Sequence, residues 1–172
     1  MKASTRSFNL IQFFALILFI CGLVCAGGCT TPGSSIEVKQ TLAKTLSGYK
    51  TVAVEITNKD PDFGTNEVDQ LTGSILGGLL KSGRFDKVYD GTTPDEHNAG
   101  LKLSVVVRLV LAANMNKVQS IEASVELTDL RDGKTLATAL VNAHSEWALF
   151  GGHMTNAIAK LSDQIVDFAT KP

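Results

Sequence analysis

Three segments in the second half of the chain alternate apolar and polar residues, and this alternation constrains the fold more than any other feature. Over residues 101–111, Leu and Val occupy every second position, from Leu101 to Leu111, and are expected to share one face of a strand. Val106 and Val110 add apolar side chains to the other face, as in a central strand. Over residues 121–127, apolar residues at every second position alternate with Glu and Ser, which indicates a strand with one solvent-exposed face. Asp132-Gly133 is a hairpin signal, so residues 135–147 are predicted to return as the next strand.

The remaining sequence predicts two more strands and two helices. Residues 51–57 form a β-branched, alternating run, and residues 85–89 form a shorter strand. Between these strands, apolar residues recur at intervals of three and four over residues 68–80, which predicts a helix. A last helix is predicted over residues 152–170, whereas residues 36–50 fit either a helix or an extended lead-in.

The first predicted helix carries its own boundary signals and two internal glycines. Asn66 is placed to cap its start, and Gly83 lies just beyond its end. Gly73 and Gly77 lie four residues apart inside it, and each costs about 1 kcal/mol relative to alanine. We therefore expect the helix backbone to approach the sheet closely at these two positions.

The order β-α-β-β-β-β-α predicts an α+β fold, specifically a two-layer α/β sandwich. The sheet is expected to be mixed but mostly antiparallel, with both helices on one face and a comparatively polar opposite face. The first strand, the helix and the second strand form a crossover unit, so these two strands are expected to be parallel. Residues 36–172 are predicted to form a single domain.

A cationic and then apolar leader precedes this domain. Lys2 and Arg6 are followed by an apolar run over residues 13–24, which then gives way to Ala26-Gly27-Gly28-Cys29. The length of the run and the small residues that close it are typical of a secretory signal peptide. An uncleaved transmembrane anchor is the alternative, because about 20 apolar residues can span a bilayer.

The leader resembles a bacterial lipoprotein signal peptide, with Cys29 at the end of its lipobox. The resemblance implies that residues 1–28 are removed by cleavage between Gly28 and Cys29, that diacylglycerol is joined to the Cys29 thiol, and that the new amino group is acylated, for example with palmitate. Residues 29–35 would then be a lipidated tether, joining the domain to the membrane. In Gram-negative lipoproteins, Asp directly after the lipidated cysteine commonly retains the protein at the inner membrane. This chain has Thr30 at that position, so the resemblance implies the periplasmic face of the outer membrane in a Gram-negative host. The inner membrane is the alternative.

The domain itself resembles a family of bacterial lipoproteins that carry a domain of unknown function. The resemblance rests on Tyr49-Lys50-Thr51-Val52-Ala53-Val54, on Leu80-Lys81-Ser82-Gly83-Arg84-Phe85 and on Lys87-Val88-Tyr89, and it spans residues 45–168. More distantly, the arrangement is similar to the amino-terminal domain of TolB and to periplasmic lipoproteins that assist envelope machines. These motifs are structural and none of them is catalytic.

Composition argues against several classes of partner. The chain has 16 basic and 17 acidic residues, and the leader contributes basic residues only, so a nucleic-acid partner is not expected. All three cysteines lie at or before Cys29, and His97, His144 and His153 have no cysteine and no second histidine at short spacing. We therefore predict no metal site and no cofactor.

No set of residues forms a convincing catalytic motif. Ser145 is adjacent to His144 on a predicted strand, where neighbouring side chains point to opposite faces. His97 and the acidic residues before it lie in a polar loop, and Glu122 and Glu126 are about 13 Å apart along their strand. The chain is therefore not expected to be an enzyme.

Binding is the better hypothesis, and aromatic residues in loops mark the candidate positions. Trp147 and Phe150 lie beside a glycine pair between the last strand and the last helix, and Phe63 is a weaker candidate. The alternative for the first pair is core packing. We predict a non-catalytic accessory or binding module that contacts another envelope protein or polymer. The alternatives are a cell-envelope hydrolase, with Asp62, His97 and His153 converging in a cleft, and an oligomeric, structural subunit of an envelope or secretion assembly.

Overall fold

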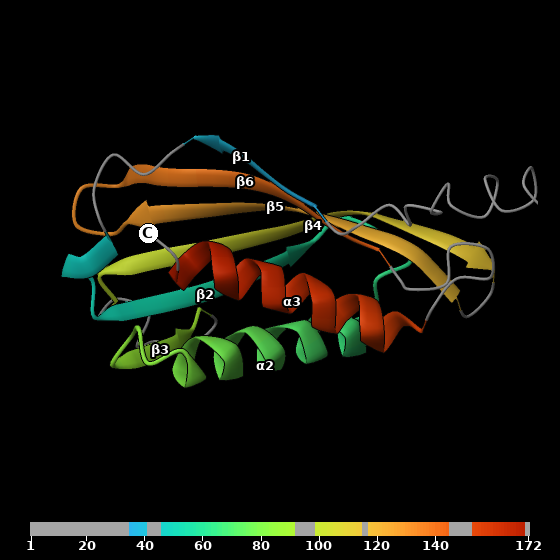
Figure 1. The fold of residues 1–172 in the computed structure, drawn as a ribbon, viewed down its shortest axis with the longest axis horizontal. Helices are drawn as coiled ribbons and strands as arrows, with labels where there is room; N and C mark the ends of the chain where they lie inside the picture. Colours follow the sequence, from blue (N-terminus) through green and yellow to red (C-terminus); the bar gives the residue numbers. More distant parts are fainter. Residues whose placement is uncertain (1–34, 41–45, 92–98, 115–116, 145–152, 171–172) are drawn as a thin grey trace, which may run out of the picture. The chain divides into compact units, whose positions relative to one another are not determined.

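A computed structural model describes residues 35–40, 46–91, 99–114, 117–144 and 153–170 (Figure 1). Six strands, two α-helices and a short 3-10 turn make up these residues, which confirms the α+β class. In chain order they are β1 (Ser35–Gln40), η1 (Leu46–Gly48), β2 (Thr51–Asn58), α2 (Thr65–Lys81), β3 (Lys87–Asp90), β4 (Leu101–Asn114), β5 (Lys117–Asp129), β6 (Lys134–His144) and α3 (Met154–Thr170).

The strands form one mixed sheet in the order β1-β6-β5-β4-β2-β3. Strand β2 is parallel to β3, as predicted, and it is also parallel to β4, a pairing that the sequence did not predict. The remaining neighbours are antiparallel. Strand β1 is an addition to the five predicted strands, and it begins at Ser35, the last residue of the predicted tether. It pairs with β6, where Ile36 lies opposite Val141. A six-residue edge strand has too few alternating positions to stand out in the sequence.

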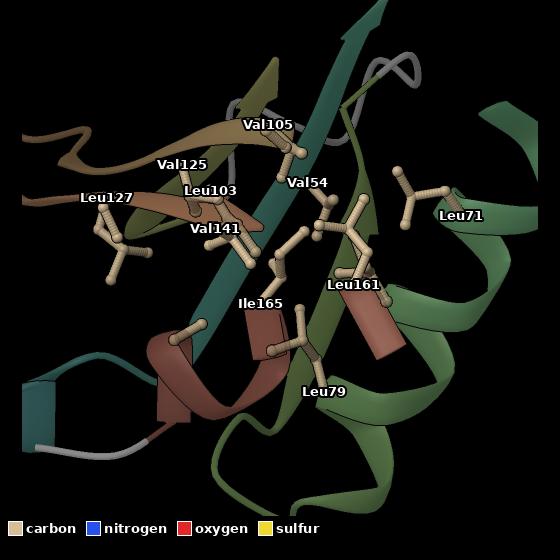
Figure 2. Packing of buried hydrophobic residues seen from close by; sticks show 14 of the residues in the cluster. Val54, Leu71, Leu79, Leu103, Val105, Val125, Leu127, Val141, Leu161 and Ile165 are labelled. Carbon is tan, nitrogen blue, oxygen red and sulfur yellow. The ribbon is translucent and has the colours of Figure 1, made fainter. Parts of the chain in front are cut away.

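The two helices lie side by side on one face of the sheet, where they close the core (Figure 1). In the close view, the sheet contributes Val54, Leu103 and Val125, while Leu79 projects from α2 and Ile165 from α3 (Figure 2). All of these side chains are buried. The predicted two-layer arrangement is therefore confirmed. Among the described residues, no helix combines the length and the apolar character needed to cross a bilayer.

The ends and glycines of α2 differ in part from the prediction. Helix α2 starts at Thr65, so Asn66 lies inside the first turn and does not cap the helix. Gly83 lies beyond the other end, as predicted, with a φ of 65° that favours glycine. A Cβ atom at Gly73 or Gly77 would meet nothing within 4 Å, so the expected close approach to the sheet is wrong. The close approach is instead at Gly78, where a Cβ would lie 2.7 Å from Cγ2 of Val166 in α3.

The strand boundaries follow the predictions with small shifts. Strand β3 begins at Lys87, because Phe85 turns into the core before the strand starts. Gly133 has a φ of 68° in the β5–β6 connection, which confirms the predicted hairpin. Strand β6 ends at His144, and the last predicted strand residues, 145–147, lie outside the described part of the chain.

Candidate binding surface

The candidate binding surface is the sheet face opposite α2 and α3, here called the helix-free face. Residues paired across neighbouring strands point to the same side of a sheet. Ser104, Glu126 and Thr138 form one such row on this face, and the next row contains Val106, Ser124 and Leu140. An open hollow of about 160 Å³ lies over these rows, lined by Ser104, Val106, Arg108, Ser124, Val125, Glu126, Thr138, Ala139 and Leu140.

At one end of this face, the polar groups interact with each other. The Glu126 carboxylate accepts hydrogen bonds from the hydroxyls of Thr128 and Thr135, at 3.1 and 2.7 Å. The Lys102 ammonium lies 3.1 Å from the Glu55 carboxylate on the neighbouring strand. These contacts hold the charged groups in ordinary sheet-surface pairs, and none of them pairs a nucleophile with a base.

A β-bulge changes the other end of the face. Val107 lies opposite Ala123 and Leu109 lies opposite Glu122, so Arg108 is an extra residue on β4. The side-chain alternation is reset at this point. The prediction that Leu109 and Leu111 share a face with Leu101 and Val107 is therefore wrong. They lie on the helix-free face, 43% and 46% exposed, while Val110 turns inward opposite Ile121.

The loop after β2 holds this bulge in place. The Asp60 side chain is 8% exposed, and its Oδ2 accepts a hydrogen bond from the Val110 N–H at 2.9 Å. Its Oδ1 accepts another from the Asp62 N–H, also at 2.9 Å. The Lys59 N–H donates to the Val107 carbonyl at 3.0 Å, which ties the loop to the strand. Asn58 and Val107 are the last pair between β2 and β4, and beyond this point the Asp60 carboxylate supplies the acceptor for the Val110 N–H.

Phe63 belongs to the same loop, and the structure corrects its predicted role. Its ring is 1% exposed and packs in the core, because the Asn58 side-chain amide bonds to the Phe63 and Asp60 carbonyls and turns the loop inward. The Asp60 N–H donates to the Asn58 Oδ1 at 2.9 Å, which completes the turn. The aromatic side chain of Phe63 is therefore a core residue and not part of a partner-binding surface.

A buried polar cluster closes the opposite end of the sheet. The Asp129 carboxylate, 2% exposed, accepts a hydrogen bond from the Tyr49 hydroxyl at 2.6 Å and two from the Arg131 guanidinium at 2.9 and 2.7 Å. The hydrogen bonds from Arg131, and then the one from Tyr49, hold the pKa of Asp129 well below its usual range. Burial and then the hydrogen bond to Asp129 raise the pKa of Tyr49. This cluster joins the start of β2 to the β5–β6 hairpin.

The cluster at Asp129 is structural and not catalytic. The Arg131 guanidinium carbon lies 4.8 Å from the centre of the Tyr49 ring, so the cation covers the ring as well as pairing with the carboxylate. Arg84 donates a hydrogen bond to the Tyr49 carbonyl at 3.2 Å. The Arg131 backbone N–H donates to the Asp129 carboxylate at 3.0 Å, so its two oxygens already accept from four donors and have no lone pair left for a substrate.

Several of the predicted site residues lie outside the described part of the chain. These are Gly28, Cys29, His97, Ser145, Trp147 and Phe150. Asp62 and His153 are described and exposed, the first in the loop after β2 and the second just before α3. Within the described residues, no group of three His, Cys, Asp or Glu side chains is placed to hold a metal ion.

Sequence reasoning missed the residues that shape the apolar end of the helix-free face. These are Asp60, Arg108, Leu109 and Leu111. The available signal was the apolar character of both Val106 and Val110, which interrupts a strict alternation along β4. This pattern predicts a centrally placed strand, which is correct, but it also accompanies a change of face at the bulge.

Comparison with known proteins places the fold among solved bacterial structures. The sequence matches no protein-family model and no curated protein. Crystal structures of a PelC dodecamer from Paraburkholderia phytofirmans align at TM-scores of 0.61 and 0.58, with 14% identity over 81% of this chain and 99% of the PelC chain. Protein XCC0632 from Xanthomonas campestris, of the family DUF330, aligns at a TM-score of 0.50, with 14% identity over 71% of this chain and 82% of that one. The chain therefore shares a fold with bacterial proteins that include a DUF330 member, and the more distant resemblance to TolB stays a prediction.

Proposed function

We propose that this chain is a lipid-anchored protein of the bacterial envelope, attached through Cys29, that acts by contact and not by catalysis. The anchor is supported by the leader, which ends in two glycines before a single well-placed thiol. The domain would then act at the periplasmic face of the outer membrane, as an accessory or structural subunit for another envelope protein or polymer.

The observation that carries a contact function is the state of the helix-free face. Its polar end is occupied by carboxylates that already pair with neighbours, such as Glu126 with two threonine hydroxyls. Its other end presents Leu109 and Leu111 to solvent. The paired polar groups surround an open hollow, and such a surface is suited to binding because it offers area and shape without an activated group.

Self-association is the form of contact that the fold comparison favours. PelC, which shares this fold, is described as a dodecamer. The sheet also ends in two edge strands, β1 and β3, and edge strands are ready sites for pairing with another chain. We propose that copies of this chain assemble in the envelope. Sedimentation of the Cys29→Ser variant over a range of concentrations tests this, and a monomer at every concentration contradicts it.

Metabolic labelling with a palmitate analogue tests the anchor. The wild-type chain should take up label and fractionate with membranes, whereas Cys29→Ser should take up none and keep its leader. Cys25→Ser is the matched control, because Cys25 follows the bulky Val24 and should be dispensable. Photo-crosslinking of the labelled protein in intact cells then tests the contact function. If a photo-crosslinker placed at each of many surface positions yields only uncrosslinked chains, the contact function is contradicted.

A further inference from the structure

We propose that Leu109 and Leu111 rest against the same bilayer to which Cys29 is anchored, so that the apolar end of the helix-free face is a membrane-contact surface. This inference rests on the proposed lipid anchor at Cys29 and adds a second, non-covalent contact to it. The occupant is a lipid surface, and no protein partner is needed to cover the two leucines.

The first step is that the outward direction of these leucines is built into the fold. If β4 continued its regular alternation past Val107, Leu109 and Leu111 would point inward with Val107, and Val110 would point outward. The bulge instead sends Leu109 and Leu111 outward, and the nearly buried Asp60 carboxylate binds the Val110 N–H between them. The fold thus exposes two leucines at a defined position, and such an exposed apolar surface is suited to contact with a lipid surface.

The second step is their position relative to the tether. The strand register places Leu109, Glu122, Asn142 and Ser35 in one row across β4, β5, β6 and β1. Three strand spacings of about 4.8 Å separate the ends of this row, or about 14 Å in total. Six residues lead from Cys29 to Ser35, and they span at most about 21 Å. The tether is therefore long enough for the acylated cysteine and the leucines to meet one bilayer surface.

The third step is the chemistry around the leucines. The Arg108 side chain is about half exposed beside them, and its contact with the Glu122 carboxylate is long, at 4.0 Å. Leucines with a neighbouring arginine suit the boundary between acyl chains and lipid phosphates. The Lys102–Glu55 pair and Glu126 lie toward the opposite end of the face, where they would remain in water.

The size of the patch favours lipid over a protein. A stable protein interface buries about 800 Å² on each partner, far more than two half-exposed leucines can supply. A bilayer has no such threshold, because an acyl anchor already holds the chain at its surface and each further apolar group adds to that affinity.

Depth-dependent quenching of a fluorescent label tests the proposal on the lipidated, full-length mature protein. The Cys29 thiol is consumed by its lipid and the other two cysteines precede the cleavage site, so an introduced cysteine is the only reactive one. Leu111→Cys is labelled with an environment-sensitive dye, and the protein is reconstituted into phosphatidylethanolamine and phosphatidylglycerol vesicles containing spin-labelled lipid. Leu80→Cys is the control, because Leu80 is 54% exposed but lies on α2, in the helix layer.

The expected result is that spin-labelled lipid quenches the label at position 111 about two-fold or more and leaves the label at position 80 nearly unchanged. Equal, weak quenching at both positions would overturn the membrane contact. If the protein still floats with the vesicles in a Cys29-dependent way, the lipid anchor itself would stand. Shielding of position 111 from aqueous iodide without quenching by lipid would identify a protein as the cover and would also overturn the proposal. A chain that carries no lipid would overturn both proposals together.

Discussion

Replacing Asp60 with alanine should weaken the fold and release the bulge in β4. The change leaves the buried Val110 N–H without an acceptor, which costs about 2 kcal/mol, and it removes a charge-assisted hydrogen bond from the Asp62 N–H, worth about 1 kcal/mol more. We therefore expect the free energy of unfolding to fall by about 3 kcal/mol, or the melting temperature by about 10 °C in a domain of this size.

Urea unfolding of the Cys29→Ser protein, followed by circular dichroism, measures this change. Asp60→Asn keeps one carbonyl acceptor and should lose about half as much stability. Asp62→Ala is the control, because it keeps the Asp60 carboxylate and the Asp62 N–H, and it should stay within about 0.5 kcal/mol of the parent. If Asp60→Ala also stays within that margin, the Asp60 carboxylate does not hold the bulge and our explanation of the exposed leucines fails.

Three further predictions concern packing, charge and location. Gly78→Ala should destabilise the domain by about 1 kcal/mol, because the new Cβ meets Val166 at 2.7 Å. Gly77→Ala adds its Cβ to open space and should stabilise the domain by about 1 kcal/mol in the same urea assay. A stability change of the same sign for both variants would contradict this. Because the pKa of Asp129 is lowered in the folded state, its contribution to stability is complete above the ordinary pKa of 3.8 and is lost as the pH falls toward the folded-state pKa. Asp129→Asn should therefore flatten the acid limb of a plot of unfolding free energy against pH. An unchanged acid limb would contradict this. Thr30→Asp should move the protein from outer-membrane to inner-membrane fractions on a sucrose gradient, and an unchanged distribution would argue against lipoprotein sorting.

The sequence was sufficient for the parts of the fold that depend on local periodicity. The alternation in β4 and β5, the spacing in α2 and α3, and the turn at Gly133 each result from a rule that acts over a few residues. The order of these elements then limited the topology to a sheet with helices on one face.

The errors concern contacts between residues that are distant in the sequence. The face of Leu109 depends on a bulge whose acceptor, Asp60, lies 50 residues from Val110. The contact at Gly78 depends on Val166 in the other helix, so no property of α2 alone distinguishes it from Gly77. Phe63 had the composition of a surface loop, yet hydrogen bonds from the Asn58 side chain turn that loop inward.

Intact-mass analysis of the protein extracted from the envelope tests the central claim most directly. We predict a chain that starts at Cys29 and carries the added mass of a diacylglyceryl group and an amide-linked fatty acid. A chain that retains residues 1–28, or one that starts elsewhere and carries no lipid, would contradict the account.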